Sequence, residues 1–166
     1  MTAPSRRDVV VAGHAADPVT AAAGLASADA AVRVAALGAL ERLGRLTDRD
    51  LAGAATDPAP GVRRRAAELA ATHPGCDLVP LLDDADPTVV EVAAWSCGER
   101  EAVTDAVLDR LIGLATGAAD PLVRESSAAA LGAIGDPRGL PAILAACGDK
   151  PAERRRAVLA LASFGG

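Results

Sequence analysis

The sequence predicts an all-α fold built from stacked helix pairs, and three observations support this. Asp-Pro pairs stand at positions 17, 57, 86, 120 and 136. Such a pair is a typical helix start, because the carboxylate accepts free amide hydrogens and proline has none to leave unpaired. Small aliphatic residues at helical spacing follow these starts. The chain is 51% hydrophobic but only 1% aromatic, and an alanine-rich core favours helices over strands.

The stretch 119–144 is the clearest copy of the repeated unit. Asp120 and Pro121 begin a helix, Gly135 ends it, and Asp136-Pro137 begins a second, shorter one. The predicted inward stripe of the first helix has helical spacing. Its residues are Val123, Ser127, Ala130, Leu131 and Ile134.

The other elements are partial copies of this unit. A short helix over 6–12 is expected within an N-terminal cap segment, residues 1–16, and the single repeat domain is expected over 17–166. The helices of that domain form about five antiparallel pairs. The predicted pairs are 17–26 with 29–44, 47–55 with 57–75, 78–82 with 86–98, 105–115 with 120–135, and 140–146 with 151–166.

The second helices of the pairs share one position, which is occupied by Arg33, Arg63, Val90, Arg124 and Arg154 with spacings of 30, 27, 34 and 30 residues. Self-similarity at this period is typical of an α-solenoid. The pattern DPxVRxxAAxALGxxGDPRxxPxL resembles the short HEAT repeats of the phycobilisome-lyase type, over nearly the whole chain from about residue 17. The resemblance implies a right-handed stack with the arginine-bearing helices on its concave side, and a protein-interaction or scaffold role. It does not imply lyase activity, because one fold serves many functions.

Two repeats carry an aspartate four residues before the shared arginine, a spacing that brings side chains together on a helix. We therefore expect ion pairs within and between repeats that hold each loop to the next helix. The alternative is a row of arginines that grips a phosphate or carboxylate. The predicted structural ladder comprises Asp29, Arg33, Arg63, Asp120, Arg124 and Arg154.

Trp95 is the one large ring that the repeat pattern does not require. It lies off the inward stripe, and periodicity places Glu91 near it, with Glu68 and Glu125 in the flanking repeats. Carboxylates beside an aromatic face suit a cation, so we expect a site for another protein or a basic peptide. The same position in the other repeats is occupied by Gly38, Glu68, Ala129 and Leu159.

A second hypothesis is a small-molecule-binding protein or an enzyme with its site near Trp95. Trp95 with Glu99 one turn further on resembles the aromatic-plus-acid pair of HEAT-like alkylpurine DNA glycosylases. The net charge of −5 and the lack of tyrosine argue against nucleic acid as a partner. A non-enzymatic binding or scaffold module is therefore the main expectation.

No catalytic motif, cofactor motif or metal-ligand spacing is recognised, and three widely spaced cysteines do not form a disulfide framework. We expect a cytoplasmic protein with no signal peptide or membrane span. One lysine against sixteen arginines suggests a GC-rich bacterial source. The last predicted helix carries a wide apolar band over 157–164, which predicts a homodimer or a docked partner at this end.

Overall fold

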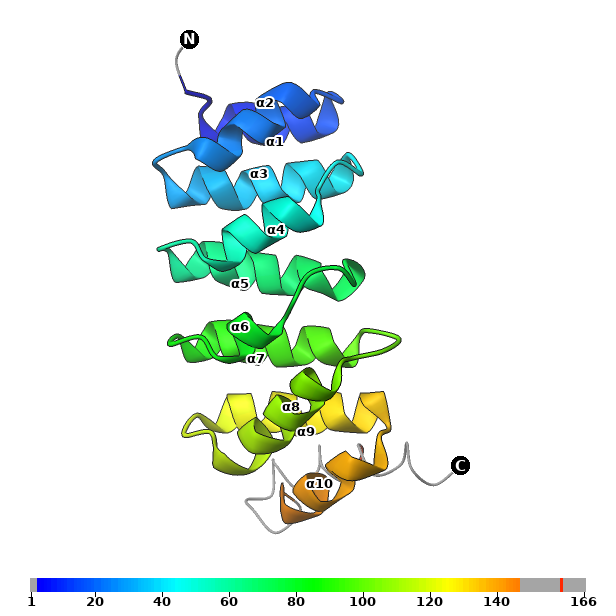
Figure 1. Ribbon diagram of the computed structural model, residues 1–166. Helices are drawn as coiled ribbons and strands as arrows, with labels where there is room; N and C mark the ends of the chain where they lie inside the picture. The colour runs from blue at the N-terminus through cyan, green and yellow to red at the C-terminus, as the bar shows by residue number, and fades with distance from the viewer. Residues whose placement is uncertain (1–2, 147–158, 160–166) are drawn as a thin grey trace.

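The computed structural model describes residues 3–146 and residue 159, and its helices stack in two rows from the N-terminus to the last helix described (Figure 1). Row A consists of α2 (Pro18–Ala23) with the 3-10 helix η1 (Gly24–Ala26), α4 (Asp48–Ala55), α6 (Val79–Leu82), α8 (Asp105–Gly117), and α10 (Leu140–Ala146) preceded by η3 (Pro137–Gly139). Row B consists of α1 (Arg6–His14), α3 (Ala30–Arg42), α5 (Pro60–Leu69) with η2 (Ala70–Thr72), α7 (Pro87–Gly98) and α9 (Pro121–Ile134). The described residues contain no strand, and the predicted all-α solenoid of stacked helix pairs is confirmed.

Helix starts follow the capping residues that the sequence predicts. Asp86 and Asp120 each accept a first-turn backbone N–H, and a proline fills the first helical position. Gly44 and Gly135 follow α3 and α9 with φ of +61° and +72°, a conformation in which a Cβ is strained. The second repeat differs: α5 begins at Pro60, so Asp57 lies two residues before the N-cap and is available for another contact.

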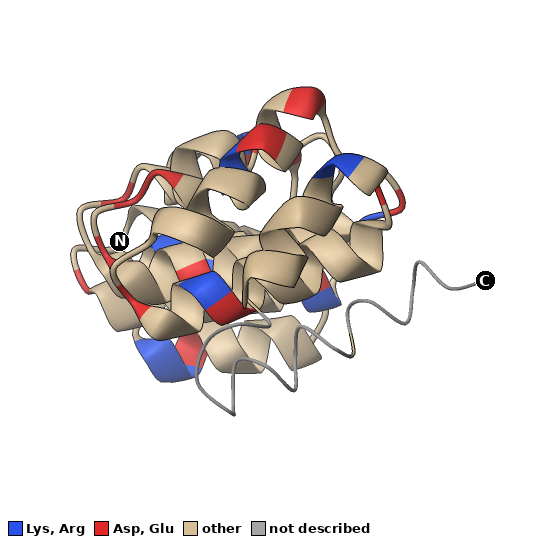
Figure 2. Ribbon diagram, turned by 90° about the horizontal axis from the view of Figure 1, so that it is seen from below, with Lys and Arg blue, Asp and Glu red and all other residues tan. Residues whose placement is uncertain are grey.

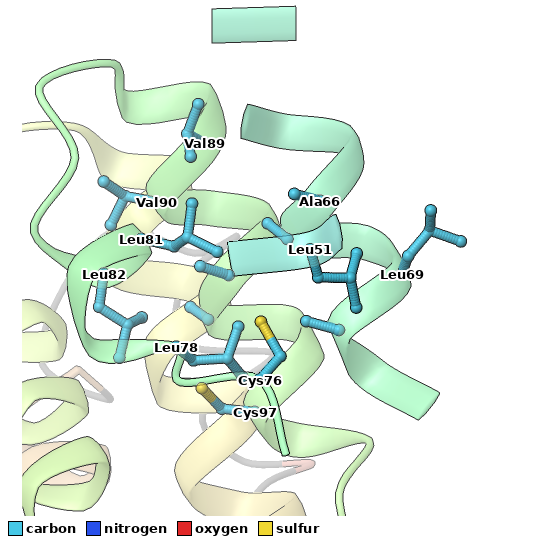
Figure 3. Close-up of a cluster of buried hydrophobic side chains, with 14 of the residues drawn as sticks. Leu51, Ala66, Leu69, Cys76, Leu78, Leu81, Leu82, Val89, Val90 and Cys97 are labelled. Carbon is cyan, nitrogen blue, oxygen red and sulfur yellow. The ribbon is translucent and has the colours of Figure 1, made fainter. Parts of the chain in front are cut away.

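The core lies between the rows and along row B, where each helix packs on the next. Its side chains are mostly alanine, valine and leucine. Figure 3 shows the middle of the stack, where Leu51 of α4 and Leu81 of α6 meet Ala66 of α5 and Val89 of α7. All four are fully buried. Burial of such small side chains allows close helix packing.

Two contacts set the spacing of α5, α7 and α9. Ser96 on α7 donates its hydroxyl to the carbonyl of Ala67 on α5 at 2.6 Å, in a fully buried position. A Cβ on Gly98 would lie only 3.1 Å from Cα of Ala130 on α9, so glycine permits the close approach of α7 and α9. Both contacts lie next to Trp95 in the sequence of α7 and fix the helices that carry it.

The shared arginine forms a ladder along the loops that lead into row B. Arg33 donates through Nε and Nη2 to both carboxylate oxygens of Asp57, each at 2.7 Å. Arg63 does the same to Asp84 at 2.6 and 2.9 Å. Nη1 of each arginine also donates to two carbonyls just before its own helix. Each guanidinium therefore ties its own loop to the loop of the next repeat.

The ladder differs from the local pairs that i, i+4 spacing predicts. Asp29 accepts the N–H of Ala31 as an N-cap, and Arg33 reaches Asp57 in the next loop. Asp120 likewise accepts the N–H of Leu122 as an N-cap. The physical reason is that a short carboxylate at the N-cap is already used by the helix start. Arg124 donates to the carbonyls of the two residues before Asp120, as its counterparts do.

Val90 replaces the arginine in the third repeat and is buried. Arg100, just after α7, ties that end of the helix back to the segment between α5 and α6, since its guanidinium donates to the carbonyls of Ala70, His73 and Cys76. The aspartates of the loops before row B gather at one end of the helices, at the left of Figure 2. Two of these aspartates join neighbouring repeats through the shared arginine, and others cap the row-B helices.

We expect Asp84→Ala to lower the free energy of unfolding by about 1.5–3 kcal/mol, the typical value of hydrogen bonds to a charged group. The Asp84 side chain is 6% exposed and accepts hydrogen bonds from Arg63 and from the N–H of Asp86. The variant therefore leaves the guanidinium of Arg63 without its carboxylate partner. Asp109→Ala on the exposed side of α8 is the control and should change stability by less than about 0.5 kcal/mol. Urea unfolding of both variants measures the difference; equal losses would contradict the ladder.

Acid should weaken the ladder. Hydrogen bonds from Arg33 and Arg63 lower the pKa of Asp57 and Asp84 below the ordinary value of 3.8. The unfolded chain then takes up protons before the folded chain, so this stabilisation is complete above pH 3.8 and is lost as pH falls through the lowered pKa values. Urea unfolding from about pH 6 to about pH 2 should show this loss. Asp57→Asn with Asp84→Asn should flatten the dependence, and an unchanged slope would contradict this assignment.

Candidate functional site

Trp95 lies on the solvent face of row B, and its side chain is 46% exposed. Ala93, Ala94, Ser96 and Cys97 around it in sequence are buried, so α7 turns its other sides to the core. A tryptophan combines a large apolar surface with a polar N–H, and a half-exposed one is typical of a binding surface. The exposure places Trp95 outside the core of the stack.

A cavity of about 240 Å³ lies beside the indole, between α7 and α9; we call it the Trp95 cavity. The small side chains of α9 leave this space, because the residue facing Trp95 in the next repeat is an alanine. Among the described residues of the lining, Glu99 supplies the one carboxylate. The lining residues are Trp95, Gly98, Glu99, Ser126, Ala129, Ala130 and Ala133.

The structure brings together some of the residues that the sequence places near Trp95. Gly98 and Ala129 line the cavity. Glu91 and Glu125 are half-buried on row B and are not among the described residues of the lining. Glu68 does not lie beside the Trp95 cavity. It forms an ion pair with Arg65 at 2.7 Å and lines a second cavity among α1, α3 and α5.

The repeat pattern did not single out Ser126 and Ala133, which line the Trp95 cavity from α9. They occupy positions one turn before and one turn after Ala129. A comparison of full helix faces across repeats, rather than of single positions, would have found them. Glu99, considered above only as part of an aromatic-plus-acid pair, lines the cavity with Trp95. Its carboxylate and the indole together suit an amine or guanidinium group.

The predicted ladder residues do not belong to this cavity, since Arg33 and Arg63 lie at the loops before row B. Arg154 lies outside the described residues. The same holds for the apolar band over 157–164, apart from Leu159, which is 72% exposed. The predicted homodimer contact at that end therefore stays a prediction.

His73, Cys76 and Cys97 have structural roles. His73 lies with Nε2 2.8 Å from Glu41 Oε2 and with Nδ1 3.7 Å from Asp48 Oδ1. Cys76 and Cys97 are buried in the core of Figure 3, and burial raises the pKa of Cys97 to about 12. That thiol stays protonated at neutral pH and is a poor nucleophile. No group of three or more potential metal ligands occurs in the part of the chain that the structure describes.

The comparison with known families agrees with this architecture. A family model of HEAT repeats matches residues 77–162, which is more than half of the chain's 166 residues, and the chain therefore belongs to the HEAT-repeat family. No curated protein matches the chain significantly. Within residues 3–146 and 159, every helix is too short or too polar to cross a bilayer.

The exposure of Trp95 has a direct spectroscopic consequence. It is the single tryptophan of the chain, so intrinsic fluorescence reports on this residue alone. We expect acrylamide to quench it readily, and Trp95→Ala to change the free energy of unfolding by less than about 1 kcal/mol, as for a surface position. Emission typical of a buried indole, together with strong destabilisation by Trp95→Ala, would contradict a surface site.

Proposed function

We propose that this protein is a non-enzymatic protein-binding module, and that it binds a basic segment of a partner protein at the Trp95 cavity. HEAT repeats are commonly protein-interaction scaffolds. The observation that carries the proposal is a half-exposed indole beside a cavity with alanine walls and a carboxylate.

The lining favours a cationic side chain. A lysine or arginine that enters the cavity contacts the indole through a cation–π interaction and approaches the carboxylate of Glu99. The alanines of α9 provide apolar surface for the methylene groups of the same side chain. Glu91 lies on the same face of row B, so its carboxylate adds to the attraction of positive charge.

The proposal can be tested with a displayed library of random peptides, because the natural partner is unidentified. We expect peptides selected on the wild-type protein to be enriched in lysine and arginine. Their affinity should fall at least about tenfold for Trp95→Ala and for Glu99→Gln, while Trp95→Phe keeps part of it. Anisotropy of labelled peptides measures the affinities.

Matched controls separate this site from general charge attraction. Val19→Ala removes an exposed apolar side chain from α2, and Glu101→Gln removes an exposed carboxylate close to Glu99 in sequence. Neither should change peptide affinity. Selection of peptides without basic residues, or equal binding to Trp95→Ala, would contradict the proposal. Tighter binding of duplex DNA with a steep salt dependence would favour a nucleic-acid reader instead.

A further inference from the structure

A second cavity of about 440 Å³ opens on the same face of row B, among α1, α3 and α5. We call it the arginine cavity. Its apolar lining, which we call its floor, includes Val10, Val34 and Ala35. Its charged and titratable lining residues are Arg6, His14, Arg42, Arg64, Arg65 and Glu68.

Gly38 on α3 makes room for two of these arginines. A Cβ at Gly38 would lie 3.2 Å from Nη2 of Arg65 and 3.7 Å from Nη1 of Arg42. The two guanidinium groups therefore meet over one point of α3, which a larger residue would occupy. The matching position holds Glu68, Trp95 or Ala129 in the other repeats, so the gap is particular to this helix.

The positive charge of the arginine cavity is largely uncompensated. Arg65 pairs with Glu68, but Arg6, Arg42 and Arg64 form no ion pair with any residue that the structure describes. The ladder residues Arg33 and Arg63, by contrast, are each bound to a carboxylate. Converging like charges repel unless an anion lies between them. The whole chain has a net charge of −5, so this local excess is opposite in sign to the protein.

We infer that the arginine cavity binds a short acidic segment of a protein partner, through its carboxylates. Guanidinium groups bind carboxylates with two parallel hydrogen bonds, and the apolar floor accepts the methylene groups of glutamate. A long polyanion fits poorly, because the face continues over α7 and α9 with Glu91, Glu99 and Glu125. This inference rests on the proposed function in so far as both sites belong to one protein-binding face.

The separation of the two cavities defines the partner further. Neighbouring row-B helices lie about 8–10 Å apart, and two to three such spacings separate α3 from the gap between α7 and α9. The distance is therefore about 20–25 Å, which an extended peptide spans in roughly six to eight residues. A partner that covers both cavities carries an acidic group and a basic group at about this separation, and the order of the two charges sets its direction on the face.

The test uses a fluorescein-labelled hexaglutamate peptide at low salt. The wild-type protein should bind it, and Arg42→Gln with Arg64→Gln should raise the Kd at least about tenfold. The matched control is Arg45→Gln with Arg49→Gln, which removes the same charge from exposed or loop positions outside the cavity and should have little effect. Trp95→Ala should leave hexaglutamate binding unchanged. A negative result for one cavity therefore does not bear on the proposal for the other.

A substitution that supplies the missing anion gives a second test. Gly38→Glu places a carboxylate between Arg42 and Arg65 and should abolish hexaglutamate binding while keeping the fold, because the side chain it meets ends in a flexible guanidinium. Gly53→Glu on α4 adds the same charge where a Cβ meets nothing within 4 Å, and should bind like wild type. Absence of binding to wild type, or equal loss in test and control variants, overturns the inference. Displacement of the peptide by inorganic phosphate at equal concentration also overturns it and assigns the cavity to a phosphate.

Discussion

The arginine at the fourth position of the row-B helices is the interaction on which the stack depends. In Arg33 and Arg63 one guanidinium satisfies two carbonyls before its own helix and a carboxylate of the next loop. These groups are partly buried, and an unpaired member would cost far more than a surface charge. The spacing of neighbouring repeats follows from this geometry, and the alanine-rich core needs that spacing because small side chains cannot adjust to a changed gap.

The ladder also separates structural charge from surface charge. The aspartates used in joining repeats lie in the loops before row B, away from the exposed face of that row. None of the ladder residues that the structure describes lines either cavity of this face. Its arginines and glutamates are therefore not required for stacking, and their arrangement is open to selection for binding.

On that face the charges are segregated along the stack. Arginines cluster over α1, α3 and α5, and glutamates with Trp95 follow over α7 and α9. In a solenoid, equivalent exposed positions of successive helices form a line along the stack. Because the charge changes from positive to negative along this line, a bound segment that carries both charges fits in one direction only. A single pocket does not provide this form of recognition.

The sequence alone determined the helices up to residue 146, the first four helix pairs and their inward stripes, because capping residues, helical periodicity and a repeat of about 30 residues are local signals. The second helix of the predicted fifth pair, over 151–166, lies outside the described residues. It also determined that Trp95 is outside the core stripe. The tertiary structure decided which charges meet. Asp57 pairs with Arg33 and Asp84 with Arg63, and Gly38 lies beneath two guanidinium groups. None of this follows from spacing within one helix, because a long arginine side chain reaches partners on neighbouring elements, and the distance between those elements is set by packing.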